Sequence, residues 1–262
     1  MSDEICEIGM KLRIEKSVCV ITPTIGQKTL TQCMDSVCKQ TYNNLTHLVV
    51  VDGTVHFDTV YQHASVFIKD SKSVITYAPF PTGKNGFYGH RIYAAYPHLV
   101  DHDYIFFLDE DNYYDPDHVA SLVDLMESKD LLWAHSLRKV YLDDKFLADD
   151  CCEATGRYPI YFTMDNPHPS HLVDTSCYAF KREFLIQVCQ NWHSGWGGDR
   201  RFYDIITHKL DVQSFDTTGK HTLNYRLPDM NRAYGGDLDF FARGNELVKQ
   251  RNGGKYPWIS SS

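Results

Sequence analysis

The chain has 262 residues, and 43% of them are hydrophobic, which is enough for one large domain with a full core. Its formal net charge of −8 argues against a nucleic-acid-binding surface, because such surfaces are usually basic. No apolar run approaches the roughly 18 residues of a membrane span, so we predict no transmembrane segment, while peripheral membrane contact through a local basic patch stays open.

The N-terminal residues and the cysteines indicate a compartment. Residues 1–16 mix charged and apolar side chains without a signal-peptide core, and we interpret them as an N-terminal extension. None of the eight cysteines forms a C-x-x-C pair, so neither a zinc ribbon nor a thioredoxin-type site is predicted. We therefore expect a reducing, cytoplasmic environment.

The first fifty residues predict a strand, a helix and a second strand. Residues 17–25 form a β-branched run, residues 29–40 place apolar side chains at helical spacing, and residues 45–51 are a second apolar run that stops at Asp52-Gly53. Pieces this short and this close in sequence predict a right-handed βαβ unit.

The same alternation continues to residue 138. It predicts a weaker helix at 57–69, a strand at 73–77, a loop at 79–89, a helix at 90–100, a strand at 104–108, a helix at 118–128 and a strand at 131–138. Alternating strands and helices indicate an α/β fold, a Rossmann-like sandwich whose mostly parallel central sheet is flanked by helices.

Three consecutive acids, Asp109, Glu110 and Asp111, follow directly on the apolar strand at 104–108. Ligands in open α/β sheets gather at the carboxyl ends of strands, where carboxylates can hold a hard divalent cation and the cation can hold phosphate. A helix start explains Asp115 with Pro116 after it, but not three acids on the strand end. The sequence therefore predicts a metal or ligand site here.

The pattern is weaker after residue 140. Residues 140–176 show no periodicity, and a connection of that length in a compact domain is usually functional. Strand and helix signals return at 177–180, 181–190, 202–209, 212–215 and 220–227, with a Gly- and Trp-rich loop at 191–200 and a polar tail at the end. Since neither G-x-G-x-x-G nor a P-loop motif occurs, a bound nucleotide would need a metal and side chains.

In this order, the motifs resemble those of the GT-A glycosyltransferases, most closely the family two nucleotide-sugar transferases. The resemblance rests on Thr22-Pro23-Thr24, the segment VVDGT at 50–54, Asn85-Gly86 with Arg91, FLDEDN at 107–112, CYAFKREF at 177–184, and Trp196-Gly197-Gly198-Asp199. It covers roughly residues 17–227 and implies a GT-A domain with a nucleotide-sugar-binding half at 17–112 and an acceptor half at 113–227, followed by a tail at 228–262.

The resemblance also implies roles for single residues. Asp111 would bind Mn²⁺ or Mg²⁺, with the late His221 as a further metal ligand, and Asp109 would contact the ribose or a metal-bound water. A cation held there stabilises the charge of a diphosphate leaving group. The donor would be a UDP-, GDP- or dTDP-sugar, contacted by Thr22, Pro23, Thr24, Asp52, Lys84, Arg91, Asp109 and Glu110.

An inverting transfer of a hexosyl or pentosyl group needs one general base. Asp199 follows the Gly-rich loop at a predicted helix start, where the helix dipole is expected to lower its pKa and keep it ionised. Trp196 offers an apolar face for a sugar ring, with Gly197 and Gly198 beside it. The acceptor would be a hydroxyl of a glycan, glycolipid or protein glycan, with its specificity in residues 140–176. His168 and His171 are weaker metal candidates.

Four positions depart from the family pattern: Val51 and Gly198 replace acids, Ile92 replaces Asn, and Glu110 lies inside the acidic motif. The missing acids leave open a non-catalytic carbohydrate-binding protein of the same fold. A sugar nucleotidyltransferase is a second alternative, although only Gly26-Gln27-Lys28 follows the first strand where a Gly-rich triphosphate loop would be needed. Structural readings also stay open: a turn former for Asp52, a helix cap for Asp199, a solvated charge for Arg91 and a core position for Trp196.

Overall fold

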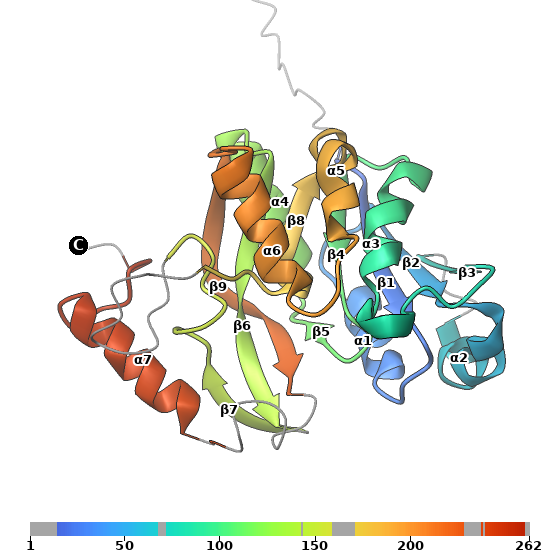
Figure 1. Ribbon diagram of the computed structural model, residues 1–262, viewed down its shortest axis with the longest axis horizontal. Helices are drawn as coiled ribbons and strands as arrows, with labels where there is room; N and C mark the ends of the chain where they lie inside the picture. The colour runs from blue at the N-terminus through green and yellow to red at the C-terminus, as the bar shows by residue number, and fades with distance from the viewer. Residues whose placement is uncertain are drawn as a thin grey trace, which may run out of the picture.

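The structure is a computed structural model that describes residues 15–67, 72–142, 144–158, 171–227, 237 and 239–259. The described strands form one mixed sheet of nine strands in the order β3-β2-β1-β4-β8-β6-β9-β5, with β7 paired to β6 (Figure 1). The strands are β1 (Val18–Thr24), β2 (Leu45–Val51), β3 (Ser73–Tyr77), β4 (Tyr104–Phe107), β5 (Tyr113–Tyr114), β6 (Trp133–Leu142), β7 (Lys145–Asp149), β8 (Tyr178–Lys181) and β9 (Phe215–Arg226).

The first half of the sheet is parallel, and its inner strands β1, β2 and β4 are almost entirely buried. β1 lies between β2 and β4, and its seven residues are all buried, which is why its sequence is apolar on both faces. Side chains alternate between the faces, so Thr22 points to Cys33 of α1 (Leu30–Cys38), whereas Pro23 packs against Gly89 at the start of α3 (His90–Ala95). Helix α2 (Phe57–Ala64) packs with α1 over β2.

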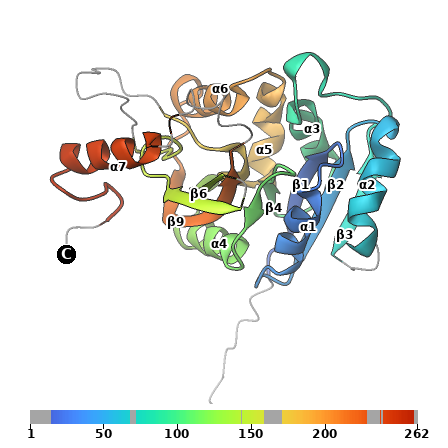
Figure 2. The same ribbon diagram turned by 90° about the horizontal axis from the view of Figure 1, so that it is seen from below.

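The second half of the sheet is mixed because β8 runs antiparallel to both of its neighbours, β4 and β6. Helix α4 (His118–Lys129) lies on the same face as α1, and α5 (Arg182–Val188) and α6 (Gly198–Asp204) lie with α3 on the other (Figure 2). Trp192 is fully buried and stacks on Phe202 of α6, with 4.6 Å between ring centroids. This contact anchors the Gly-rich loop to the core.

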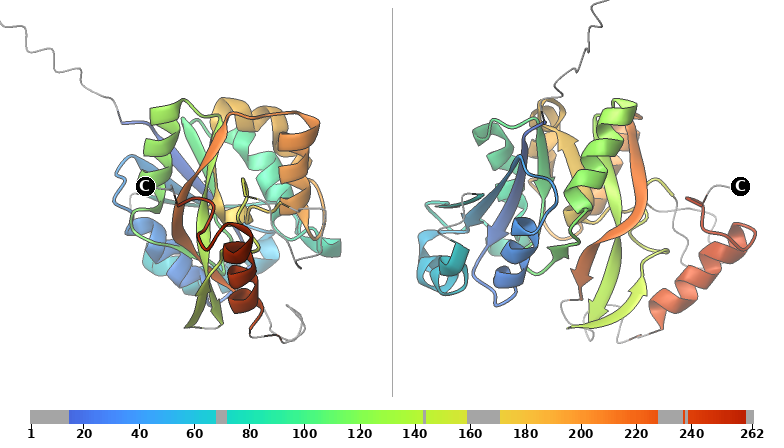
Figure 3. Two further views of the ribbon diagram at one scale, coloured as in Figure 1. Left: turned by 90° about the vertical axis from the view of Figure 1, so that its left-hand side faces the viewer. Right: turned by 180° about the vertical axis from the view of Figure 1, so that it is seen from behind.

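A helix also lies in the part of the chain that the sequence predicts to be a polar tail. Helix α7 (Phe240–Arg251), red in Figure 3, lies next to β7. Its Phe241 and Val248 pack against Val140, Cys152 and Leu227. Phe241 and Val248 are seven residues apart and so share one helix face. The sequence predicts only a polar tail for residues 228–262, and this helix is not predicted from it.

The predicted α/β class is confirmed, and most predicted elements up to residue 138 lie within a few residues of the observed ones. Three details differ. The sheet is mixed rather than mostly parallel, β7 lies within the stretch without periodicity, and β9 is one long strand instead of two short pieces. Gly219 in β9 has a φ of +65°, and the pairing with β6 shifts its register there, so the sequence TTGK forms a bulge and not a turn. None of the described helices is long and apolar enough to cross a membrane.

Candidate functional site

A cleft of about 1800 Å³ opens at the carboxyl ends of β1, β2 and β4 and extends over α6. Most of the residues predicted to form the site line it: Pro23, Thr24, Asp52, Lys84, Asp109, Glu110, Asp111, Trp196, Gly197 and Asp199. Thr22, Arg91, Gly198 and His221 do not. The fold therefore brings residues from both halves of the domain to one cavity.

Asp109 and Asp111 lie together at the centre of this cleft. Asp109 accepts a hydrogen bond of 2.8 Å from the hydroxyl of Tyr93. Burial, and then the charges of Asp111 and Asp174, raise the pKa of Asp109 well above its usual range. Burial and Glu110 raise the pKa of Asp111 to about 6. Burial, the largest cause of both shifts, thus disfavours the ionised form of both carboxyl groups in the protein without a ligand.

Whether these residues fit a metal depends on the donor set. Among the described residues, no three His, Cys, Asp or Glu side chains converge into a metal cage. Asp109 and Asp111 supply carboxylate oxygens, which Mg²⁺ and Mn²⁺ prefer, and a bound cation would favour the ionised form that burial disfavours. The pair fits a hard cation that takes its remaining ligands from phosphate and water.

The carboxylate of Glu110 holds the loop after β1. It accepts hydrogen bonds from the hydroxyl of Thr24 at 2.5 Å, from the backbone N–H of Gln27 at 2.9 Å and from that of Ile25 at 3.0 Å. These contacts explain the third acid of the motif, because the backbone N–H groups before α1 need acceptors. Direct contact between Glu110 and a nucleotide sugar stays a prediction.

Asp52 holds a second loop. Its carboxylate accepts hydrogen bonds from the backbone N–H of Thr82 at 2.6 Å, from the hydroxyl of the same residue at 2.7 Å and from the backbone N–H of Gly83 at 2.8 Å. Asp52 therefore fixes the loop that carries Lys84 into the cleft. Thr22 does not reach the cleft, because it is fully buried on the face of β1 that α1 covers. Its Oγ1 lies 2.9 Å from Nε2 of His47.

Of the two cations predicted at the diphosphate, only Lys84 faces the cleft. Arg91 donates a hydrogen bond of 3.0 Å from Nη1 to the carbonyl of Thr82, and its guanidinium lies 3.6 Å from the ring centroid of Phe87. Arg91 therefore stabilises the loop that contains Thr82 and Phe87. Because its guanidinium is bound to that loop, it does not line the cleft.

Asp199 lies in the first turn of α6 and lines the cleft, as predicted, but its electrostatics differ from the expectation. Burial, followed by the charge of Asp174, raises its pKa to about 6. The predicted lowering by the helix dipole is wrong, because burial and then the nearby acid Asp174 disfavour the ionised carboxyl group. Trp196 is 85% exposed at the cleft, which excludes a core position.

Gly198 has a packing reason for lacking a side chain. A Cβ atom built there would lie 2.6 Å from Cε1 of His90 and 2.6 Å from Oγ of Ser194. The His90 ring is fixed by a contact of 2.7 Å between its Nδ1 and the carbonyl of Ser194. The acid that the family pattern places at this position consequently has no room here.

His221 is not brought to the acids, so its predicted role as a metal ligand needs correction. Its Nε2 lies 3.1 Å from the carbonyl of Asp150 and 3.6 Å from Sγ of Cys151, outside the cleft. The bulge in β9 decides which face of the sheet this side chain occupies. His171 lines the cleft and stacks on Tyr203, whereas His168 lies outside the described residues.

Among the charged residues that line the cleft and were missed by the sequence interpretation, three form one cluster: Arg138, Glu153 and Asp174. Arg200, Arg201 and Asp204 also line the cleft and were not predicted to do so. Arg138 is 3% exposed within β6, and both acids of the cluster bond to its guanidinium. One signal in the sequence could have indicated Arg138: an arginine inside a buried strand needs buried acidic partners. Its partners lie in the stretch without periodicity, so the sequence gives no indication of which acids they are.

Comparisons with known proteins agree with this architecture. The model of the family described as Glycosyl transferase family 2 matches residues 19–189. Among solved structures, S. aureus TarS 1–349 in complex with UDP-GlcNAc is 13% identical, with a TM-score of 0.59 over 83% of this chain and 61% of that chain. The mannosyltransferase PcManGT from Pyrobaculum calidifontis, in complex with GDP-Man and Mn²⁺, is 15% identical, with a TM-score of 0.57 over 94% of this chain and 67% of that chain.

At these identities the likeness to solved structures concerns the fold, which is that of the GT-A glycosyltransferases. The chain spans less than two thirds of the TarS chain with UDP-GlcNAc. Among curated proteins, none matches it.

Proposed function

The chain belongs to glycosyl transferase family 2, and on that premise we propose that it transfers a sugar from a nucleotide-sugar donor to a hydroxyl group of an acceptor. One observation carries the proposal. A single cleft joins the acids at the end of β4 to Asp199 on α6, so a leaving-group site and a base share one cavity. The donor would be a UDP-, GDP- or dTDP-sugar.

The nucleotide would lie at the carboxyl ends of β1 and β2, where ligands of open α/β sheets bind. Pro23 and the loop held by Asp52 support this placement, and Lys84 would face the diphosphate. Asp109 and Asp111 would hold Mn²⁺ or Mg²⁺, which would act as a Lewis acid on the leaving diphosphate.

Asp199 would act as the general base on the acceptor hydroxyl. With a pKa of about 6, it is mostly ionised at neutral pH and still a useful proton acceptor, since general bases work best when their pKa lies near the working pH. One carboxylate is sufficient for a single displacement that inverts the anomeric carbon. Exposed Trp196 would stack against a carbohydrate, glycolipid or protein-glycan acceptor.

A non-catalytic carbohydrate-binding protein is the second candidate function. Two observations favour it: the carboxylate of Asp52 is occupied by its own loop, and position 198 has no room for the second acid of the family pattern. A sugar nucleotidyltransferase is the third, and it would prefer a nucleoside triphosphate.

The test is to incubate the purified protein with Mn²⁺ and a panel of UDP-, GDP- and dTDP-sugars, and to measure binding by calorimetry and slow donor hydrolysis without acceptor. A transferase binds one donor and hydrolyses it slowly. Binding of a nucleotide sugar without hydrolysis would instead support the non-catalytic carbohydrate-binding protein. Preference for a nucleoside triphosphate would support the sugar nucleotidyltransferase.

A further inference from the structure

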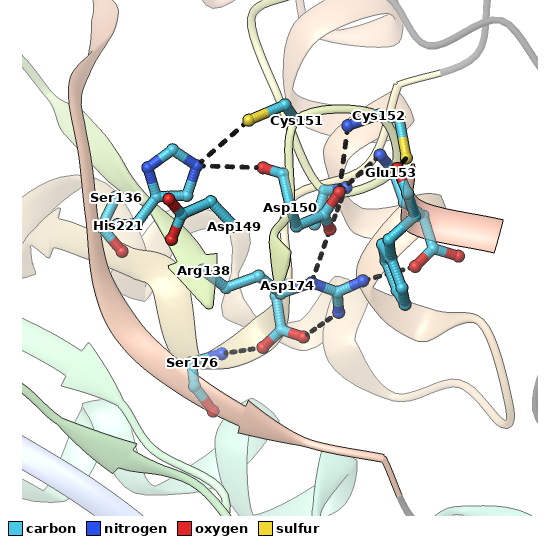
Figure 4. Close-up of polar contacts among 12 residues, drawn as sticks. Ser136, Arg138, Asp149, Asp150, Cys151, Cys152, Glu153, Asp174, Ser176 and His221 are labelled. Atoms are coloured by element: carbon cyan, nitrogen blue, oxygen red, sulfur yellow. Dashed lines mark hydrogen bonds and ion pairs between the residues drawn. The ribbon is translucent and has the colours of Figure 1, made fainter. Parts of the chain in front are cut away.

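Arg138 of β6 lines the cleft, and three carboxylates surround its guanidinium (Figure 4). Its Nε donates to Oδ2 of Asp150 at 2.8 Å, its Nη1 donates to Oδ2 of Asp174 at 2.7 Å, and its Nη2 donates to Glu153. The ring of Tyr225 lies 4.2 Å from Cζ. The guanidinium is thus engaged through all three of its nitrogen atoms.

The acids that surround Arg138 are not equivalent. Asp150 is fully buried, does not line the cleft, and accepts hydrogen bonds from the backbone N–H groups of Cys152, Glu153 and Ala154. Asp150 therefore stabilises the loop formed by residues 150–154. Asp174 and Glu153 line the cleft, so their carboxylates face whatever occupies it.

Asp174 combines a fixed position with remaining hydrogen-bonding capacity. Its Oδ1 accepts from the backbone N–H of Ser176 at 3.0 Å, and its Oδ2 accepts from Arg138. A carboxylate offers about four acceptor sites, so lone pairs remain for hydroxyl groups in the cleft. Ser176 also accepts from the backbone N–H of Asp109 at 3.0 Å, which ties the Asp174 loop to the strand-end acids.

Asp174 lines the same cleft as the three acids to which the proposed function gives a role. The backbone N–H of Ser176 donates to Asp174, and the hydroxyl of the same residue donates to Oδ2 of Asp109 at 3.4 Å, so Asp174 lies next to the strand-end acids. In a single displacement, the transferred sugar lies between the leaving diphosphate and the base. A carboxylate that lines the cleft next to the strand-end acids is therefore in a position to contact that sugar.

We propose that Asp174, held in place by Arg138, accepts hydrogen bonds from hydroxyl groups of the transferred sugar, and that Asp174 and Glu153 together restrict the donor to neutral, hydroxyl-rich sugars. This inference rests on the proposed function and assigns its sugar subsite. A uronate is excluded because its carboxylate would face two others, while the nearby guanidinium is already bound to three.

The experiment compares Asp174→Asn with Asp150→Asn, since both remove one carboxylate partner of Arg138 but only the first changes the cleft. Calorimetry with Mn²⁺ measures the affinities for UDP and UDP-GlcNAc, for GDP and GDP-Man, or for dTDP and dTDP-glucose, whichever pair the wild type binds. We expect Asp174→Asn to weaken nucleotide-sugar binding roughly 10- to 100-fold and to leave the nucleoside diphosphate affinity within about twofold. Asp150→Asn should lower the Tm and keep the wild-type ratio of the two affinities.

The inference is overturned if Asp174→Asn weakens both ligands equally or neither. A wild type that binds no nucleotide at all would instead defeat the proposed function. A measurement on the unmodified protein covers the case in which Asp174→Asn does not fold: UDP-glucuronate should bind no more tightly than UDP itself. Tighter binding of the uronate would overturn the inference in the same way.

Discussion

The Nη1 atom of Arg138 lies 2.7 Å from Oδ2 of Asp174, and this ion pair joins the middle of β6 to the loop before β8. The two side chains are 3% and 6% exposed, so solvent does not screen the interaction. The pair explains how acids on separate loops keep fixed positions in a cleft that already contains several negative charges.

Replacing Arg138 with Met should destabilise the protein by about 3–5 kcal/mol, because it leaves Asp150 and Asp174 buried without their partner. The neighbouring residue provides a matched control. Lys139 pairs with Asp115 at 2.5 Å, but both side chains are more than a quarter exposed, so Lys139→Met should cost at most about 1 kcal/mol. Urea denaturation measures both changes, and equal losses would contradict a special role for Arg138.

Replacing Asp111 with Asn should lower metal-dependent turnover by about 10²-fold or more, since it removes the carboxylate that the proposal assigns to the cation. The Tm of the variant should stay near that of the wild type. Asp117→Asn is a suitable control, because Asp117 has a half-exposed carboxylate outside the cleft. A Mn²⁺ titration of the donor-hydrolysis rate measures the effect, and a near wild-type rate would exclude Asp111 as a metal ligand.

Asp199 should give both activity and stability a pH dependence. Its folded-state pKa of about 6 lies above the ~3.9 of an unfolded aspartate, so the folded state holds the proton more tightly. Below about pH 4, Asp199 is protonated in both the folded and the unfolded state and does not lower the free energy of unfolding. This destabilisation grows as the pH rises and reaches its full size above about pH 6, where Asp199 is ionised in both states.

Two results follow from this pKa. With the metal chelated, Asp199→Asn should be more stable than the wild type at pH 7.5, by about 1–2 kcal/mol, and near pH 4 the difference should vanish. With Mn²⁺ present, the kcat of the wild type should fall as the pH drops through about 6, because protonation removes the base. Urea unfolding at both pH values decides the first point; a variant less stable at pH 7.5 would mean that Asp199 has a structural role.

Gly198→Ala should destabilise the protein by about 1–3 kcal/mol, since its Cβ would contact the His90 ring and Ser194 Oγ at 2.6 Å. His90→Ala removes one of these obstacles, so the two changes should not be additive. A double-mutant cycle followed by thermal unfolding measures the coupling. Additive losses would show that the close approach of Gly198 to His90 is not what excludes a side chain there.

The sequence was most informative where local periodicity decides the structure. Residues 17–25 and 45–51 are apolar on both faces, so the strands, their parallel pairing and the acids after residue 108 could all be predicted. That Glu110 and Asp52 each hold a loop could not be predicted, because their partners are backbone N–H groups whose positions depend on the folded loops.

Three features of the site depend on contacts that no local pattern encodes. Arg138 and Asp174 are 36 positions apart, and Asp174 lies in a stretch without periodicity. The bulge at Gly219 decides which face of the sheet His221 occupies. The place of this histidine near the end of the predicted catalytic region therefore wrongly suggested a metal ligand. A helix start was correctly expected near Asp199, but its pKa follows from burial and from Asp174, which become apparent only in the fold.

The most direct test of the central claim is a proton NMR time course of wild-type protein with Mn²⁺ and an α-linked donor such as UDP-GlcNAc or GDP-Man. The account predicts release of nucleoside diphosphate together with a sugar, or a transferred product, whose first-formed anomer is β. A β product means inversion by a single displacement, the reaction in which the account gives Asp199 the role of the one base. No sugar release from any donor of the panel, or an α anomer formed first, would contradict the account.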